Sequence, residues 1–349
     1  MKVIRAGTLG FCMGVRRAVE MAMSVSDTVS ATVSDTVSDE VSATVSDKAS
    51  EEASVYTLGP LIHNPRVLEM LKNRGVVCLN EGEVPRNLSR DKPHDKPTVL
   101  IRAHGVSPLV EADLAQQGMT VLDATCPNVK VSQQKVRSFA ERGYRLFLAG
   151  EENHAEIAGL KGYAFAGVSQ DGLCLLAANP TEAEAAALEL FRREPGAKTV
   201  LIGQTTIRAE EYFSIGEKIR QYFPSLEIVN SICGATRERQ EALRELCGKV
   251  DAVLVAGGSG SANTRRLLSL ALELGKPAWL VQAPEDIPPE ISAYKTVGLS
   301  AGASTPDGLI DEIENALKAK ENNQNNTLRR ERRQIENPEG ICLRSSPTT

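Results

Sequence analysis

The stretch LGFCMGVRRAVE, residues 9–20, places Cys12 between a glycine-containing turn and the start of an amphipathic run. The residues before it, MKVIRA, are typical of a short strand. The same order of strand end, cysteine and amphipathic helix with basic residues in its first turns occurs twice more, around Cys126 in DATCPNVKVSQQKV and around Cys233 in NSICGATRERQEAL. These segments predict three similar units, each of which contributes one thiol at the start of a helix.

The rest of the chain alternates short aliphatic runs with amphipathic ones. The strand-like runs include KVIRA, SVYTL, TVLIRA, TVLDA, YRLFLAG, KTVLIG, DAVLVAGG, PAWLVQ and KTVGLSAG. Helix-like runs follow most of them, for example at Pro108–Gln117, Val129–Arg142, Ala209–Tyr222 and Ala262–Leu274. This alternation predicts an α/β fold with mainly parallel sheets.

We expect three α/β domains, at residues 1–125, 126–230 and 231–319. Residues 25–48 interrupt the first domain with six near-identical tetrads, VSDT VSAT VSDT VSDE VSAT VSDK. Valine, serine, threonine and aspartate are mediocre helix formers, and the tetrad pattern gives a strand no clean apolar face. The tetrads are therefore expected to be a low-complexity insertion that is mostly disordered or loosely structured. Residues 320–349 lack periodicity and are expected to form a disordered tail.

Length, composition and charge bound the class of protein. A chain of 349 residues with 42% hydrophobic and only 4% aromatic residues suits an aliphatic core in two or three compact domains. The formal net charge is −5, and the only dense basic stretch, LRRERR, lies in the polar tail, so no nucleic-acid partner is expected. There is no apolar run long enough to cross a membrane and no signal-like N-terminus, which favours a cytoplasmic protein.

Seven cysteines are scattered along the chain without any C-x-x-C pair, which argues against a disulfide framework or a zinc ribbon. A helix N-terminus stabilises a thiolate, because free N–H groups and the positive end of the helix dipole lie there. Four thiolates usually hold a [4Fe–4S] cluster, so three would leave one iron with an open position. The alternative is that Cys12, Cys126 and Cys233 are small buried hydrophobes. Core packing is expected for the cysteines in apolar patterns, which are Cys78, Cys174 and Cys247.

Three of the four histidines lie beside small or turn residues at the ends of predicted strands: His63 in PLIHNP, His104 in RAHGVS and His154 in ENHAEIAG. The carboxyl ends of parallel strands are where α/β proteins bind their ligands. Imidazoles and helix N-termini can share a phosphate, so these positions favour an anionic ligand. Glu156, two residues after His154, is a candidate proton carrier, and a salt-bridged surface glutamate is the alternative.

Turns rich in small and hydroxyl residues also follow predicted strands, namely VAGGSGSANTRR at 255–266, SAGAST at 300–305 and GQTT at 203–206. The first begins like a dinucleotide-binding G-x-G-x-x-G, but Asn263 occupies the position of the third glycine, and there is no Walker lysine. We therefore expect a phosphate cradle that is not committed to a nucleotide.

Together these segments resemble one known family. The motifs G-F-C-x-G-V-x-R-A, H-N, A-H-G-V, D-A-T-C-P-x-V, H-x-E, Q-T-T, I-C-x-A-T-x-x-R-Q, an S-x-N turn and S-A-G-A-S-x-P occur in one order between about Val3 and Ala319. This order is similar to that of the 4-hydroxy-3-methylbut-2-enyl diphosphate reductases, which complete the methylerythritol phosphate route to isoprenoids. Each motif is weak by itself, whereas nine in one order are highly specific.

The resemblance implies a trefoil of three α/β domains around a central iron–sulfur cluster. It implies one [4Fe–4S] cluster per chain, with Cys12, Cys126 and Cys233 as its ligands and one open iron. The residues implied to bind the substrate are His63, His104, His154, Thr205, Ser261, Ala262, Asn263 and Ser304. Glu156 would relay a proton to the allylic hydroxyl group, and Thr205 would help to orient that group. Two electrons from a ferredoxin or flavodoxin, with two protons, would expel water and give isopentenyl and dimethylallyl diphosphates.

Two positions depart from the family pattern. Ala262 replaces the middle serine of S-S-N, so we expect weaker diphosphate binding, but not its loss, because the backbone N–H of Ala262 can still donate. Gly234 follows Cys233 in place of a larger residue. Two other classes of protein stay open: a non-catalytic iron–sulfur sensor, which leaves the histidines without a role, and a nucleotide-dependent dehydrogenase that uses the Gly258 turn.

Overall fold

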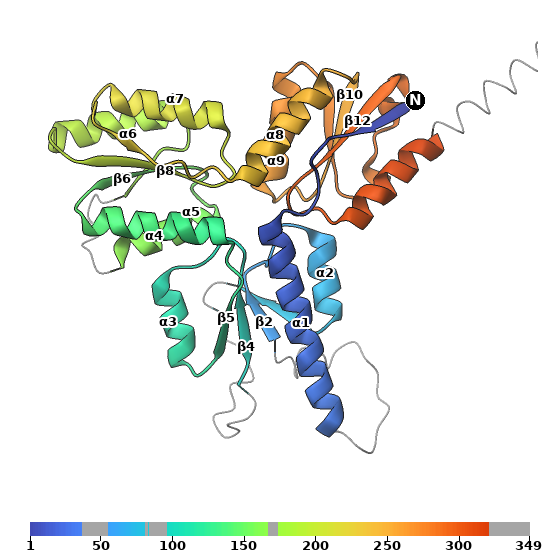
Figure 1. Cartoon of the computed structure of the whole chain (residues 1–349), viewed down its shortest axis with the longest axis horizontal. Helices are drawn as coiled ribbons and strands as arrows, with labels where there is room; N and C mark the ends of the chain where they lie inside the picture. Colours follow the sequence, from blue (N-terminus) through green and yellow to red (C-terminus); the bar gives the residue numbers. More distant parts are fainter. Residues whose placement is uncertain (37–54, 81–82, 84–95, 167–173, 321–349) are drawn as a thin grey trace, which may run out of the picture.

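The structure, a computed structural model, describes residues 1–36, 55–80, 83, 96–166 and 174–320. These residues form three units, each built on a four-stranded sheet in which all neighbouring strands are parallel. Figure 1 shows the units as three lobes that meet near the middle of the molecule. The predicted α/β class and three-lobed arrangement are confirmed.

The first unit has the strand order β3-β2-β4-β5. Its strands are β2 (Val55–Leu58), β3 (Val76–Leu79), β4 (Thr98–Ile101) and β5 (Thr120–Asp123). Its helices are α1 (Met13–Thr36), α2 (Pro65–Asn73) and α3 (Pro108–Gln116). Asn64 and Ser107 cap α2 and α3 through side-chain oxygens that accept from the backbone, and a proline follows each cap.

The second unit has the strand order β7-β6-β8-β9. Its strands are β6 (Arg145–Ala149), β7 (Cys174–Leu176), β8 (Thr199–Gly203) and β9 (Glu227–Ile228). Its helices are α4 (Pro127–Glu141), α5 (Ala155–Phe165), α6 (Pro180–Arg193) and α7 (Ala209–Arg220). Helices cover both faces of this sheet, which is why β6 and β8 are continuous apolar runs rather than alternating ones.

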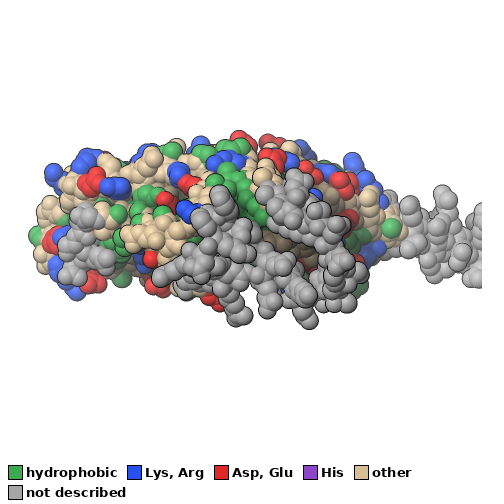
Figure 2. All heavy atoms as spheres, turned by 90° about the horizontal axis from the view of Figure 1, so that it is seen from below, with side chains coloured by type: hydrophobic (Ala, Val, Ile, Leu, Met, Phe, Trp, Pro, Cys, Tyr) green, Lys and Arg blue, Asp and Glu red, His purple; other side chains and the backbone are tan. Residues whose placement is uncertain are grey.

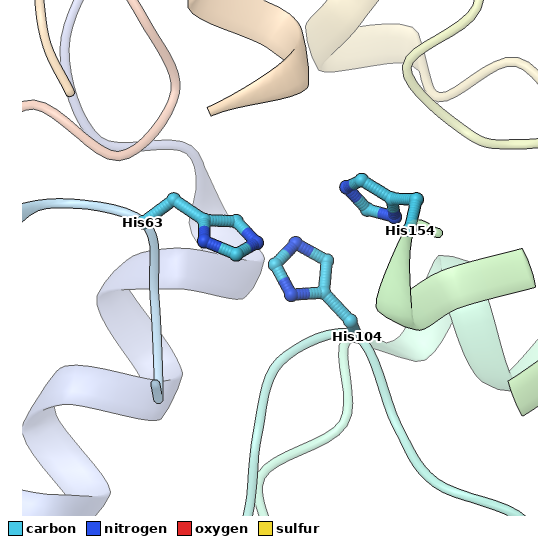
Figure 3. Close-up of side chains that lie close together, drawn as sticks. All are labelled: His63, His104 and His154. Carbon is cyan, nitrogen blue, oxygen red and sulfur yellow. The ribbon is translucent and has the colours of Figure 1, made fainter. Parts of the chain in front are cut away.

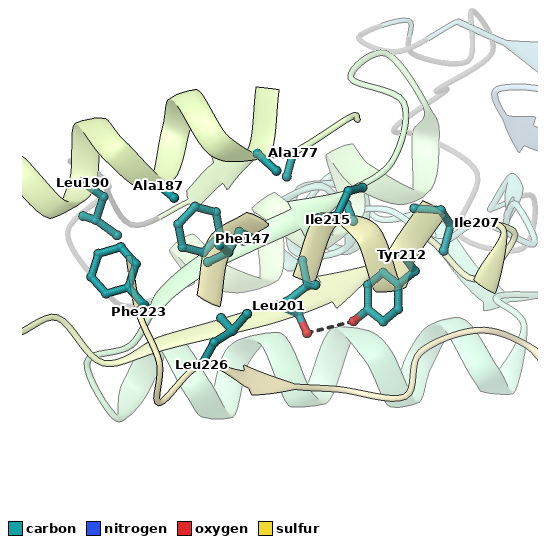
Figure 4. Packing of buried hydrophobic residues seen from close by; sticks show 13 residues of the cluster. Phe147, Ala177, Ala187, Leu190, Leu201, Ile207, Tyr212, Ile215, Phe223 and Leu226 are labelled. Carbon is teal, nitrogen blue, oxygen red and sulfur yellow. Dashed lines mark hydrogen bonds between the residues drawn. The ribbon is translucent and has the colours of Figure 1, made fainter. Parts of the chain in front are cut away.

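Figure 4 shows one of the two apolar layers of the second unit, where Phe147 of β6 and Leu201 of β8 pack against side chains of α6 and α7. The hydroxyl group of Tyr212 crosses this layer and donates to the carbonyl of Leu201 at 2.9 Å. Fully burying side chains of this size stabilises the fold by about 1.5–3 kcal/mol each. The layer therefore anchors β8, the strand that leads into the turn with Thr205.

The third unit has the strand order β1-β12-β10-β11. Its strands are β1 (Lys2–Arg5), β10 (Ala252–Ala256), β11 (Ala278–Val281) and β12 (Thr296–Ala301). Its helical segments are α8 (Gly234–Cys247), α9 (Ala262–Glu273), the 3-10 turns η1 (Pro284–Asp286) and η2 (Pro289–Ala293), and a helix over residues 307–320. The first strand of the chain thus completes the sheet of the last unit, while the expected domain limits stay a prediction.

The tetrad repeat differs from its expected loose structure, because residues 25–36 continue α1 as helix. Val25 packs on the core of the first unit, and Ser26 is buried and donates to the carbonyl of Arg74 at 2.5 Å. Asp27 pairs with the guanidinium of Arg74 at 2.9 Å. Tertiary contacts thus override weak helix propensity in the first tetrads. Residues 37–48 and 321–349 lie outside the described residues.

Core packing is confirmed for Cys247, which is buried. Cys174 is half-buried, and burial raises the pKa of its thiol to about 12. The prediction is wrong for Cys78, because β3 is an edge strand and turns this side chain to the exterior. None of the helices among the described residues is long and apolar enough to cross a membrane. Figure 2 shows one face of the molecule, on which basic and acidic side chains are interspersed.

Candidate active site

The three units meet around one cavity, which is lined by loops at the carboxyl ends of strands and by helix N-termini. The structure brings nearly all the predicted site residues together in its wall: Cys12, His63, His104, Cys126, His154, Thr205, Cys233, Ser261, Ala262, Asn263 and Ser304. Glu156, the remaining predicted residue, lies directly behind Thr205 and is hydrogen-bonded to it. Residues more than 240 positions apart in sequence therefore share one site.

The predicted cysteines occupy equivalent places in the three units. Each follows a strand at one side of its sheet and precedes a helix, α1, α4 or α8. Each backbone N–H donates to the loop after the neighbouring strand, with distances of 3.1 Å for Cys12 to Ala303, 2.9 Å for Cys126 to Ala103 and 2.9 Å for Cys233 to Thr205. The repeated sequence pattern thus corresponds to a repeated local structure, and it directs three half-buried thiols into the same space.

Two further observations show how closely these thiols are held. A side-chain carbon on Gly14 would lie 2.4 Å from Sγ of Cys126, so only glycine lets α1 approach this sulfur. The side-chain amide of Asn128 donates to Sγ of Cys233 at 3.0 Å. Burial raises the pKa of Cys126, the backbone N–H groups of Asn128 and Val129 lower it, and the neighbouring cysteines raise it. Sulfur ligands from three helix starts fit a group that binds thiolates, and an iron–sulfur cluster is such a group.

The histidines form a second cluster in the same cavity. Figure 3 shows His63 from the loop after β2, His104 from the loop after β4 and His154 at the start of α5, with their rings turned toward one another. The ring centroids are 4.9 Å apart for His63 and His104, 5.0 Å for His104 and His154, and 5.8 Å for His63 and His154. Side chains from two units thus converge on one point.

These imidazoles are neutral when the cavity holds no anion. Burial is the main cause that lowers the pKa of all three, and it takes that of His154 to about 3. Charge repulsion from His154 and His63 also lowers the pKa of His104. Nε2 of His63, Nδ1 of His104 and both amide atoms of Asn263 are buried without a partner among the described residues. Unpaired buried polar atoms are costly, so this group of atoms is suited to a polar ligand.

The start of α9 provides further donors on the other side of the cavity. Ser261 is its N-cap and accepts from the N–H of Thr264 at 3.3 Å. The N–H groups of Ala262 and Asn263, which come before Thr264 in the first turn, have no acceptor within the helix and can serve a ligand. Ser304 lies in the loop after β12, where its hydroxyl donates to the carbonyl of His63 at 3.3 Å. A helix N-terminus beside hydroxyl groups is a typical anion site, and the phosphate cradle expected at this turn stays a prediction.

Glu156 is completely buried at the start of α5. Its carboxyl group accepts from the backbone N–H of Thr205 at 2.7 Å and from the Thr205 hydroxyl at 3.0 Å. Burial raises the pKa of Glu156 to about 7, although the Thr205 hydrogen bonds and the charge of Arg266 act in the opposite direction. The carboxyl group can therefore carry a proton near neutrality, and the surface salt bridge that was its alternative role is absent among the described residues.

Two polar neighbours of the site, Asn128 and Arg266, were not predicted from the sequence, whereas Thr206 belongs to the hydroxyl-bearing turn GQTT that was. Thr206 lines the cavity beside Thr205, and its hydroxyl accepts from Arg266 at 2.7 Å. A usable signal existed for Arg266, because it lies three residues after Asn263 and hence on the same face of α9. Its neighbour Arg265 carries the same charge, so the residue type alone could not show which of the two arginines lies at the site.

Parallel-sheet units that bring thiols, imidazoles and a buried carboxyl group into one cavity define a three-lobed α/β protein with a central ligand site. The LytB protein family model matches residues 37–318, and the chain belongs to this family. It is 42% identical over 344 residues to a 4-hydroxy-3-methylbut-2-enyl diphosphate reductase of Treponema pallidum, with 91% of this chain and 84% of the relative covered. It is 35% identical to the reductase of the same name from Aquifex aeolicus, with 90% of this chain and 96% of that relative covered.

Solved structures show the same architecture. The E-1-hydroxy-2-methyl-but-2-enyl-4-diphosphate reductase from Plasmodium falciparum matches with a TM-score of 0.71 at 24% identity, over 90% of this chain and 87% of that one. A structure titled (E)-4-hydroxy-3-methyl-but-2-enyl diphosphate reductase, the terminal enzyme of the non-mevalonate pathway, matches with a TM-score of 0.56 at 32% identity, over 91% and 100% of the two chains. The former likeness establishes the fold, and the latter agrees with the family membership.

Proposed function

We propose that this chain catalyses the reductive dehydroxylation of 4-hydroxy-3-methylbut-2-enyl diphosphate to isopentenyl and dimethylallyl diphosphates. The observation that carries the proposal is one cavity with three helix-start thiols at one side, uncharged imidazoles at another and a buried carboxyl group beside them. The named relatives support the same reaction. The sensor and dehydrogenase alternatives leave this combination of groups without a purpose.

The reaction replaces an allylic C–O bond with a C–H bond. The substrate takes up two electrons and two protons, and its hydroxyl oxygen leaves as water. We propose that Cys12, Cys126 and Cys233 hold one [4Fe–4S] cluster per chain through their thiolates. When bound, such a cluster supplies the electrons singly and offers one Lewis-acidic iron that lacks a protein ligand.

The chain's own residues bind the diphosphate end of the substrate. We propose as binding residues His63, His104, His154, Ser261, Ala262, Asn263 and Ser304. The imidazoles become protonated donors as the anion enters, and the start of α9 adds backbone N–H groups and a favourable dipole. The backbone N–H of Ala262 replaces the missing serine hydroxyl.

Glu156 delivers the proton that converts the departing hydroxide into water. Burial raises the pKa of its carboxyl group to about 7, so the group can carry a proton near neutrality, and the Thr205 hydroxyl lies between it and the cavity. Thr205 orients the allylic hydroxyl group, and its backbone N–H holds the carboxylate that remains after proton transfer.

The electrons are proposed to come from a ferredoxin or a flavodoxin, in the cytoplasm. The test is an anaerobic incubation of cluster-reconstituted protein with a reduced viologen dye and the substrate, followed by product analysis. Isopentenyl and dimethylallyl diphosphates formed at one molecule per two dye electrons support the proposal. A full cluster with tight diphosphate binding and no product would reject it in favour of the sensor.

A further inference from the structure

We propose that Arg266 is a positioning residue for the proton donor, which it reaches from a different unit of the molecule through the turn Gln204–Thr206. This inference rests on the proposed function. Arg266 belongs to α9 of the third unit, whereas the turn and Glu156 belong to the second unit. The residue therefore joins the helix whose N-terminus faces the anion site to the group that supplies the proton.

The contacts of Arg266 are arranged as a fork. One terminal nitrogen donates to the Thr206 hydroxyl at 2.7 Å, and the other donates to Oε1 of Gln204 at 3.4 Å. The second nitrogen also lies 3.5 Å from the carboxylate of Glu151, and only 11% of the Arg266 side chain is exposed. Because both outer residues of the turn are held, the residue between them, Thr205, cannot rotate freely.

The turn is also tied together from within. The side-chain amide of Gln204 donates to the Thr206 hydroxyl at 2.9 Å, and Oε1 of Gln204 accepts from the backbone N–H of Glu151 at 3.2 Å. Thr205 then offers its N–H and its hydroxyl to Glu156. The chain of contacts from Arg266 to the carboxyl group thus passes through a single turn, without any surface residue between them.

The titratable groups near Glu156 come from three segments. Arg266 approaches from α9, Glu151 lies in the loop before α5, and His154 is the N-cap of the helix that carries Glu156. His154 is uncharged, and its Nδ1 accepts from the backbone N–H of Glu156 at 3.1 Å. The positive charge of Arg266 lowers the pKa of Glu156, against the larger effect of burial. Loss of this charge therefore keeps Glu156 protonated to higher pH.

Positioning and charge make separate predictions for kcat/KM as a function of pH. In Arg266→Met the maximal value falls about 10-fold or more, and the basic limb moves up by roughly half a pH unit or more. In Arg266→Lys the charge stays but the planar fork is lost, so the maximal value falls while the limb stays in place. KM for the substrate changes less than kcat in both variants, because Arg266 contacts Gln204, Thr206 and Glu151 directly and acts on the diphosphate site only through its charge, which lowers the pKa of His154.

Arg208→Met is the matched control. Arg208 precedes the first residue of α7, and its side chain pairs with Glu273 at the end of α9, so it joins the same two units without a side-chain contact to Gln204 or Thr206. Its removal is expected to leave the pH profile unchanged. An unchanged profile in Arg266→Met, or the same change in Arg208→Met, overturns the inference.

Amide hydrogen exchange of the cluster-reconstituted proteins provides a readout that does not depend on turnover. The Thr205 amide is expected to exchange about 10-fold faster or more in Arg266→Met and at the wild-type rate in Arg208→Met. If the wild-type protein never oxidises the dye, the proposed function is rejected. The exchange rate of the Thr205 amide would then still test whether Arg266 positions the turn. Unaltered exchange in Arg266→Met rejects the inference.

Discussion

The burial of Glu156 costs folding stability and at the same time suits this residue to its proposed role as proton donor. Its carboxyl group is completely buried, and two hydrogen bonds from Thr205 are its direct partners. These bonds favour the charged form, yet burial dominates and brings the pKa to about 7. A general acid works best with a pKa near the operating pH, so the cost of burial is what suits this group to its proposed role.

The stability of a Glu156→Gln variant is therefore expected to depend on pH. The pKa of Glu156 in the folded state, about 7, lies above its ordinary value of 4.5. The free energy of unfolding of the wild type therefore falls as the pH rises from about 4.5 through about 7, because the buried group must then either lose its proton or keep it at a cost. Glutamine carries no charge at any pH. The difference in unfolding free energy between the variant and the wild type is therefore expected to shift in favour of the variant by about 3 kcal/mol when the pH is raised from about 5 to about 8.5. Urea unfolding at the two pH values measures this, and an equal difference at both would contradict the buried charge.

The histidine cluster predicts proton uptake on anion binding. Burial and mutual repulsion lower the pKa of His63, His104 and His154, and a bound diphosphate raises it. Binding of inorganic pyrophosphate should then take up protons and weaken as the pH rises through the pKa values of the bound state. Calorimetry in buffers of different ionisation enthalpy measures the uptake. Binding without proton uptake, or binding that strengthens with pH, would show that the imidazoles do not contact the anion.

At the scale of elements, the helix starts could be predicted and their extents could not. A cysteine between a strand end and an amphipathic run is a local pattern, and local patterns correctly placed α1, α4 and α8. The continuation of α1 through residues 25–36 depends on contacts with Arg74 and the core of the first unit, which the repeat itself does not reveal. Long-range packing, rather than propensity, decides such segments.

Gly14→Ala tests the close approach of α1 to Cys126. The added carbon would lie 2.4 Å from the Cys126 sulfur, so the variant should bind much less iron after reconstitution while its circular dichroism stays that of the wild type. Gly234→Ala is the control, because it lies directly after Cys233 and an added carbon there meets nothing within 4 Å. Full iron content in Gly14→Ala, or an equal loss in both variants, would refute the proposed arrangement of the cysteines.

At the scale of the whole molecule, the site exists only because three separately built units meet. The strand-to-cysteine pattern predicted the three units, and the resemblance to a family predicted which residues would line the cavity. The sequence did not predict that β1 would join β12, because parallel pairing between strands almost 300 residues apart leaves no local signal. It also did not separate Arg266 from Arg265, since burial of one and exposure of the other arises only where α9 packs on the second unit.

The central claim is that this assembled cavity reduces an allylic diphosphate with Glu156 as the proton donor. The most direct measurement compares substrate-dependent oxidation of reduced viologen by wild type and Glu156→Gln, both carrying a full complement of cluster absorbance. The account predicts oxidation by wild type and a rate lower by about 10²–10⁴-fold in the variant, with the absorbance retained. Oxidation at the wild-type rate in Glu156→Gln, or no oxidation by a fully loaded wild-type protein, would contradict it.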